Sequence, residues 1–455
     1  MPEMCVLAPT GSLGAGYRVE SLQRAMAWEP DFIGCDAGST DSGPYYLGAS
    51  AFHFSIAAMR RDLQHMLAAA RGARIPLLIG SAATGGSDDQ LSVVVGLVED
   101  LARQAGHHFR LGVVRSEPSR EYLRNKCREK KIHPLGAAPS IDESVFDRSA
   151  HIVAVAGMEP FQAALDLGAD VVISGRSTDA SIFAAIPTRA GLPAGPVWHA
   201  AKILECGAAA VVHRKYSDPL VAWIRDDHFV VEPPNPDYRC TPTSVAAHAL
   251  YENGSPVELV EPSGTLWLDR VTYEAVNDRA VKVSGSRFEP SDRYTVKLEG
   301  AELVGYQTVV IGSVRDPIIL RQLDSWLEGM QAAGRRRLED VFGVEEAASI
   351  QIGVRRYGID GTLGKLEPDP RVAHEVALVF EITTNSQDLA TSAAKAVTHI
   401  ASHYAVPEWH GLISALAFPH SPAELNRGAV YRFNLNHVLE LEDPLEPFSI
   451  DTRNI

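Results

Sequence analysis

The first 205 residues alternate short apolar runs with segments of helical periodicity, and this alternation constrains the fold more than any other feature. A parallel sheet covered by helices on both faces needs continuous apolar strands, because neither of its faces meets water. We therefore predict an α/β fold with a doubly wound, mainly parallel sheet, and a (β/α) barrel is the alternative. The predicted strands are residues 4–8, 31–34, 75–80, 111–114, 151–156 and 170–173.

The pattern changes after residue 205, where short β-like runs at 266–299 indicate a mixed, antiparallel region. Further on, the sequence predicts a compact α+β unit from a strand at 375–383, a helix at 388–403 and a strand at 429–441. A chain of 455 residues is too long for one ordinary core. The predicted domains are a ligand-binding α/β domain at 1–205, a mixed α+β region at 206–340 and a C-terminal α+β domain at 341–455.

The charge and cysteine content exclude several classes of partner. A formal net charge of −15 argues against nucleic acid and anionic membranes, because both require a basic face. No run approaches the roughly 18–20 apolar residues of a membrane span, and we expect no signal peptide. Five cysteines without CxxC spacing favour a reducing compartment. We therefore expect a cytoplasmic protein that binds a small molecule and forms a homo-oligomer.

Four predicted strands end in loops of small and polar residues, namely APTGSLGAGY, CDAGSTDSGP, GSAATGGSDD and SGRSTDAS. Ligands of open α/β sheets bind outside the carboxyl ends of the strands, so these loops are expected to meet at one edge. Residues Gly11, Ser12, Gly14 and Gly16 of the first loop lack GxGxxG spacing, which disfavours a dinucleotide site. They are predicted to bind a carboxylate or phosphate at a helix N-terminus, with a tight turn as the alternative.

The second and third loops supply acids and small residues. Asp36 and Asp41 are candidates for general acid–base work or for a hard cation, and capping of backbone N–H groups is the alternative, favoured for Asp41. Asp88 and Asp89 are better explained as acids that complement a helix dipole. The residues expected to contact substrate here are Ser39, Thr40, Gly85 and Gly86.

The fourth loop contains the most specific pair, Arg176 and Asp179. A guanidinium at a strand end is suited to a substrate carboxylate, and Asp179 is a candidate base; an N-cap or a mutual salt bridge is the alternative. Ser177 and Thr178 are expected to contact substrate. The last candidates are Glu205 as an acid and Cys206 as a thiol, although a cysteine flanked by small residues is usually a core residue.

The case for other chemistries is weaker. A divalent metal ion would have Asp36 and Asp179 as its ligands, and no HxH or HExxH pattern supports zinc. The GxSxG motif of serine hydrolases is absent.

Longer motifs surround these loops: GSLGAGYRVES at 11–21, VVISGRSTDAS at 171–181, LECGAAAV at 204–211, PTSVAAHALYENGSP at 242–256 and WLDRVTYEAVNDRAVKVSGSR at 267–287. Through them the chain resembles the acyclic terpene utilisation (AtuA-like) family over most of its first 310 residues. The tail at 416–450 is similar to a subgroup that is associated with a small companion protein.

The resemblance implies an enzyme of branched-acid catabolism, with a lyase step on a hydroxylated acyl thioester. It carries over Arg176, Thr178 and Asp179 as site residues, followed by Glu205 and Cys206. We therefore expect a lyase or hydratase that acts on a small hydroxy-carboxylate or its acyl thioester. The alternative is a non-catalytic or regulatory large subunit, which would bind the companion through residues 418–455.

Overall fold

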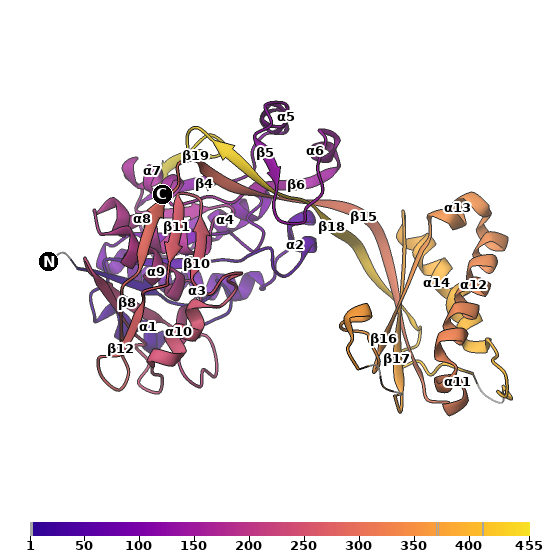
Figure 1. The fold of residues 1–455 in the computed structure, drawn as a ribbon. Coiled ribbons are helices and arrows are strands. Elements are labelled where there is room, and N and C mark those ends of the chain that lie inside the picture. Colours follow the sequence, from indigo (N-terminus) through magenta and orange to yellow (C-terminus); the bar gives the residue numbers. More distant parts are fainter. Residues whose placement is uncertain (1–2, 370, 372, 412–413) are drawn as a thin grey trace. The chain divides into compact units, whose positions relative to one another are not determined.

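A computed structural model describes residues 3–369, 371, 373–411 and 414–455 of the chain. Its described part divides into two compact units (Figure 1). The first unit comprises Met1–Glu302 and Phe433–Ile455, and the second comprises Leu303–Arg432. Both boundaries fall inside long strands, β15 (Tyr294–Val314) and β18 (Glu424–Leu441).

The first unit is built on one large sheet with the order β12-β13-β9-β8-β1-β2-β3-β7-β4-β19. Neighbours from β1 to β4 in this order are parallel, and the strands outside them are antiparallel. The parallel strands are β1 (Met4–Ala8), β2 (Phe32–Asp36), β3 (Leu77–Gly80), β7 (Val171–Ser174) and β4 (Arg110–Arg115). The antiparallel ones are β8 (Leu220–Ile224), β9 (His228–Glu232), β13 (Val281–Ser284), β12 (Thr272–Ala275) and β19 (Ser449–Asn454).

Helices cover both faces of this sheet, because successive apolar residues of each central strand point to opposite sides. On one face, Ile33 and Ile79 pack against α1, α3 and α4; on the other, Phe32 and Leu78 pack against α7, α8 and α9. The predicted α/β class with a mainly parallel sheet is therefore confirmed, and the sheet is open, not a barrel. The helices of the unit are α1 (Val19–Met26), α2 (Pro44–Gly48), α3 (Ile56–Ala73), α4 (Asp88–Ala105), α5 (Arg120–Arg128), α6 (Ser144–Arg148), α7 (Glu159–Asp166), α8 (Asp179–Arg189), α9 (Ala194–Leu204) and α10 (Pro242–Ala249), with a 3-10 turn η1 (Gly207–Ala210).

One predicted member of the parallel series lies elsewhere. The run at 151–156 forms β6 (Ser149–Ala154), which pairs antiparallel with β15 and not with the large sheet. Its partner residues, such as Leu298 opposite Ala154, follow far along the chain, so no local pattern reveals the pairing. The remaining strands of the unit are β5 (Ile132–Pro134), which pairs with β18, and the small antiparallel sheet of β10 (Glu258–Glu261), β11 (Gly264–Trp267) and β14 (Arg287–Pro290).

The second unit follows a βαββαβ order of the ferredoxin-like type. Its strands are arranged β16-β17-β15-β18, where β16 spans Gln351–Tyr357 and β17 spans Val376–Thr384. Val310 and Phe380 pack beneath helices that include Trp326 and Val397, as the α+β pattern predicted. The helices are α11 (Pro317–Arg321), α12 (Leu323–Phe342), α13 (Val344–Ser349) and α14 (Gln387–His403), with a 3-10 turn η2 (Gly364–Leu366). Among the residues described in both units, no helix is long and apolar enough to cross a membrane.

Strands β1, β2, β3 and β7 are adjacent and parallel, so their carboxyl ends lie at one edge of the sheet. Glycines let the loops at this edge approach one another closely. A Cβ on Gly86, after β3, would lie 2.2 Å from the backbone nitrogen of Arg176, after β7. A Cβ on Gly38, after β2, would lie 2.2 Å from Cα of Thr84. The loops therefore pack backbone to backbone.

We expect Gly86→Ala to destabilise the protein more than Gly106→Ala. Both residues have a left-handed backbone conformation, with φ of 69° and 67°, so alanine adds a similar backbone strain of about 1–2 kcal/mol at each. Gly106 has no atom within 4 Å of an added Cβ, whereas Gly86 faces Arg176 backbone, which adds about 1–3 kcal/mol. Urea denaturation measures both changes, and equal losses would contradict the close packing of the loops.

Candidate functional site

A cavity of about 230 Å³ lies where the four strand-end loops meet. Its described wall also includes residues that follow α9 and α10. The predicted site residues on this wall are Gly11, Ser12, Asp36, Ser39, Asp179, Glu205 and Cys206. The structure thus brings together residues from distant parts of the chain, as the parallel sheet requires.

Asp36 is the last residue of β2 and is buried. Its Oδ2 accepts a hydrogen bond of 3.2 Å from the Gly38 N–H, whereas Oδ1 has no hydrogen-bond partner among the described residues. Burial raises the pKa of this carboxyl well above its usual range, the charge of Asp179 adds to the rise and Arg176 opposes it. Asp36 therefore brings to the cavity wall a buried carboxyl group whose ionisation is disfavoured and whose Oδ1 has no partner among the described residues.

Asp179 opens α8, directly after the N-cap residue Thr178. Its Oδ1 lies 3.5 Å from Nη1 of Arg176 and accepts no hydrogen bond from the described residues. Burial raises the pKa of Asp179 to about 6, although Arg176 and Lys202 lower it. At neutral pH this carboxylate is ionised yet close to its pKa, which suits a general base.

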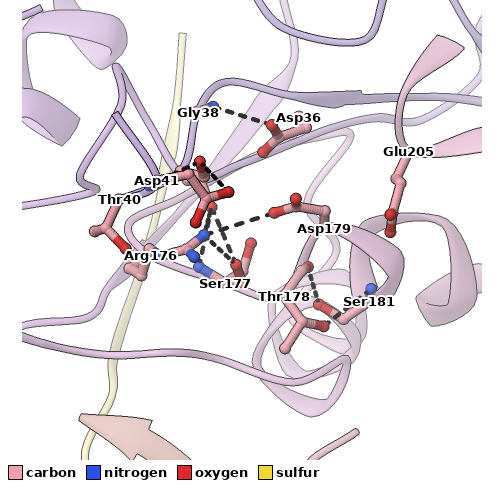
Figure 2. Close-up of polar contacts among 12 residues, drawn as sticks. Asp36, Gly38, Thr40, Asp41, Arg176, Ser177, Thr178, Asp179, Ser181 and Glu205 are labelled. Carbon is pink, nitrogen blue, oxygen red and sulfur yellow. Dashed lines mark hydrogen bonds and ion pairs between the residues drawn. The ribbon is translucent and has the colours of Figure 1, made fainter. Parts of the chain in front are cut away.

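Glu205 follows α9 and accepts a hydrogen bond of 2.5 Å from Nζ of Lys202. Burial raises the pKa of Glu205 to about 8, in spite of Lys202 and with a further rise from Asp179. Figure 2 shows Asp36, Asp179 and Glu205 on separate elements, with the carboxylate of Asp179 directed toward Arg176. Glu205 is therefore protonated at neutral pH while Asp179 is ionised, and such a pair can act as acid and base.

Cys206 lines the cavity but its thiol is not activated. Burial raises the pKa of this thiol, and the charge of Glu205 raises it further, so the thiolate is disfavoured. The backbone of Cys206 packs closely against Gly11, because a Cβ added to Gly11 would lie only 2.6 Å from the Cys206 carbonyl oxygen. This contact packs the first loop against the segment after α9.

Arg176 lies behind the cavity wall, with 8% of its surface exposed. Its Nε donates to Oε2 of Glu299 at 3.0 Å, and its Nη1 donates to Oγ of Ser81 at 2.9 Å. Glu299, on β15, also accepts from Thr40 at 3.0 Å and contacts Nζ of Lys297 at 2.7 Å. Burial raises the pKa of Glu299, but Arg176 and Lys297 together lower it to about 2, so the pair is fully ionised.

The other predicted residues also lie outside the described cavity wall. The N–H groups of Gly14 and Gly16 donate to Oδ2 of Asp62, a buried acid on α3, at 2.9 and 3.0 Å. An internal carboxylate thus occupies the place predicted for a substrate anion. The rest serve the packing between loops or line other surfaces: Thr40, Gly85, Gly86, Ser177 and Thr178.

Sequence reasoning missed several residues of the site. Tyr251 and Glu252 line the cavity after α10, and their place within the motif at 242–256 was a signal that could have found them. Thr84 lines the cavity from the third loop, in which only Gly85 and Gly86 are predicted to contact substrate. Glu299 has no local signal, because it lies within a long strand and meets Arg176 across 123 residues of sequence.

The cavity wall is acidic. Its carboxyl side chains are Asp36, Asp41, Asp179, Glu205 and Glu252, and none of the described residues that line it is Lys or Arg. Such a wall is suited to exchanging protons with an uncharged polar group and disfavours a free carboxylate. No group of three or more His, Cys, Asp or Glu is placed to hold a metal ion within the described ranges, and the role of Asp36 and Asp179 as metal ligands stays a prediction.

Comparison with known proteins identifies one family. The family described as acyclic terpene utilisation family protein AtuA matches residues 59–190 and 198–423. These ranges include Thr84, Arg176, Asp179, Glu205 and Glu299, whereas the first two loops precede them. No curated protein and no solved structure matches the chain.

We expect Arg176→Met to destabilise the protein by about 3–5 kcal/mol, because it leaves Glu299 buried beside Lys297 alone. The double variant Arg176→Met/Glu299→Gln is expected to lose less, since the uncompensated charge is gone. Arg189→Met, which breaks the exposed pair with Asp166, serves as the control and should change little. Urea denaturation distinguishes these cases, and additive losses in the double variant would contradict the coupling.

Proposed function

Because the chain belongs to the acyclic terpene utilisation (AtuA) family, whose name denotes a catabolic process, we propose that it is a catabolic enzyme of the lyase or hydratase class. Its substrate is a small hydroxyacyl group, held as an acyl thioester. The observation that carries this proposal is the meeting of Asp36, Asp179 and Glu205 in one cavity, with the pKa of each carboxyl raised.

The protonation state of each of the three carboxyl groups determines its role in the reaction. Asp179, ionised at neutral pH, accepts the proton that the substrate loses. Glu205, protonated at neutral pH, donates a proton to the leaving oxygen or to the carbon left by C–C cleavage. The carboxyl group of Asp36, whose ionisation burial disfavours, donates a hydrogen bond to the substrate carbonyl, where negative charge develops.

The charges of the wall favour the thioester over the free hydroxy-carboxylate. A thioester acyl group is uncharged, whereas a carboxylate would meet several acids and no cation on the described wall. Arg176, which was predicted to bind a substrate carboxylate, is instead occupied by Glu299, Ser81 and the Ser177 carbonyl. Its role in this proposal is to hold the loops and Asp179 in position.

The companion protein and the homo-oligomer stay predictions. Residues 433–455 of the segment predicted to bind a companion include β19 and the second half of β18, whose backbones pair with β4 and β5 within the first unit. No observation in the described chain favours the regulatory-subunit function over the enzyme.

We expect Asp179→Asn and Glu205→Gln each to lower turnover of a hydroxyacyl-CoA thioester by about 100-fold or more, because each removes one partner of the proton exchange. Asp88→Asn is the matched control. Asp88 also opens a helix after a parallel strand and has a pKa raised to about 6, by burial first and then by Glu117, but it lies outside the cavity wall. Equal losses in the control and the site variants would contradict the assignment.

The pH dependence follows from the same two groups. We expect kcat/KM to fall below about pH 6, where Asp179 becomes protonated, and above about pH 8, where Glu205 ionises. Steady-state rates across this range check the expectation. A rate that rises steadily through pH 8 would be incompatible with Glu205 as the acid.

Thermal-shift measurements identify the substrate class independently of turnover. We expect hydroxyacyl-CoA thioesters at millimolar concentration to raise the melting temperature more than the corresponding free hydroxy acids do. Stabilisation by the free acids alone would overturn the preference for an uncharged acyl group.

A further inference from the structure

A second group of reactive side chains lies outside the acidic cavity. Oγ of Ser50 is 3.0 Å from Nε2 of His151, and Nδ1 of His151 is 3.0 Å from Oε1 of Glu117. Ser50 follows α2, His151 lies on β6 and Glu117 follows β4, and all belong to the first unit. A hydroxyl, an imidazole and a carboxylate in this sequence of contacts have the geometry of a nucleophile, its base and the group that orients the base.

The hydrogen bonds determine which imidazole nitrogen carries the proton. Oε2 of Glu117 accepts the backbone N–H of Asp88 at 2.8 Å, so Glu117 acts as an acceptor through both oxygens. Nδ1 of His151 must then be the donor to Glu117, so that in the neutral imidazole the lone pair of Nε2 faces the Ser50 hydroxyl. His151 is thus placed to accept the proton of Ser50.

The backbone of Ser50 is unusual for its residue type. Its φ is 47°, in the left-handed region that non-glycine residues seldom adopt, and such residues cluster at functional sites. Ser50 is half-buried, and the side chains of His151 and Glu117 are each 19% exposed, so the group is partly open to solvent.

The surroundings of Ser50 include the start of a long helix. Oγ of Ser87, the N-cap residue of α4, lies 3.0 Å from Oγ of Ser50. The positive end of the helix dipole is therefore adjacent to the place where an oxyanion would form. Asp89, whose carboxylate is 4.0 Å from Nε2 of His151 and largely exposed, disfavours an anionic substrate.

We propose that Ser50, His151 and Glu117 form a separate acyl-transfer site that hydrolyses small uncharged esters. Oγ of Ser50 attacks the ester carbonyl carbon while its proton passes to Nε2 of His151. The bond to the alcohol oxygen breaks as His151 returns that proton to the leaving alkoxide. Water then attacks the acyl-serine, His151 relays its proton to Ser50, and the carboxylic acid is released.

This proposal is independent of the acidic cavity. None of its three residues lies on the described wall of that cavity, and the site lacks the GxSxG motif because the serine follows a short helix and not a strand. Loss of one activity therefore leaves the other intact, and Asp179→Asn is expected to retain the reactivity of Ser50.

A fluorophosphonate probe tests the proposal on the full-length protein. The probe transfers its phosphonyl group to an activated serine with loss of fluoride, and peptide mass spectrometry locates the adduct. We expect an adduct on Ser50, and hydrolysis of p-nitrophenyl acetate that the probe inhibits. Ser50→Gly is the informative variant, because glycine keeps the left-handed backbone unstrained while it removes the hydroxyl.

The partners are tested with matched variants. His151→Asn is expected to slow labelling of Ser50 by about 100-fold or more, and Glu117→Gln to slow it less. Ser92→Ala is the control, since Ser92 lies on the same helix α4 and its exposed hydroxyl donates to the Asp88 carbonyl, and it should leave labelling within a few-fold of the wild type. Absence of an adduct on Ser50 in the folded wild type, or equal labelling in His151→Asn, would overturn the proposal.

Discussion

The buried ion pair between Arg176 and Glu299 is the interaction on which the arrangement of the candidate site depends. A guanidinium is tolerated in this interior because a carboxylate and the surrounding hydroxyl and carbonyl groups replace its water. The pair joins the loop after β7 to β15, and Ser81 extends the connection to the loop after β3. It therefore fixes Asp179 relative to the rest of the cavity without itself contacting the cavity.

The cations that contact the acids of the wall, Arg176 and Lys202, do not themselves line the described cavity. Arg176 and Lys202 lower the pKa of Asp179, and Lys202 lowers that of Glu205, yet burial has the larger effect on both. The two acids consequently differ in protonation at neutral pH, whereas both would be ionised in water. The raised pKa values of these two acids thus result mainly from burial, and cations that do not line the cavity lower them in part.

Much of the fold could be predicted from the sequence, because continuous apolar runs and strand-end loops are local patterns. The positions of Asp36 and Asp179 at strand ends on one edge of the sheet followed from them. Contacts made across long stretches of chain did not: Glu299 on Arg176, Asp62 on the glycine loop, and β15 beside β6 have no local signature. The substrate-binding role predicted for Arg176 rested on its residue type. A guanidinium binds a buried carboxylate of the protein, such as Glu299, as well as it binds a substrate carboxylate, so the residue type does not distinguish the two.

The return of Phe433–Ile455 to the first unit has a consequence for biosynthesis. Strand β19 covers the edge of β4, so this edge of the large sheet stays unpaired until Ser449–Asn454 have been synthesised. Leu303–Arg432, whose strands and helices are contiguous in the chain, is available for folding earlier. Synthesis of the first unit therefore begins first but is completed only after that of the second unit. The large sheet has an unpaired edge while Leu303–Arg432 is being translated.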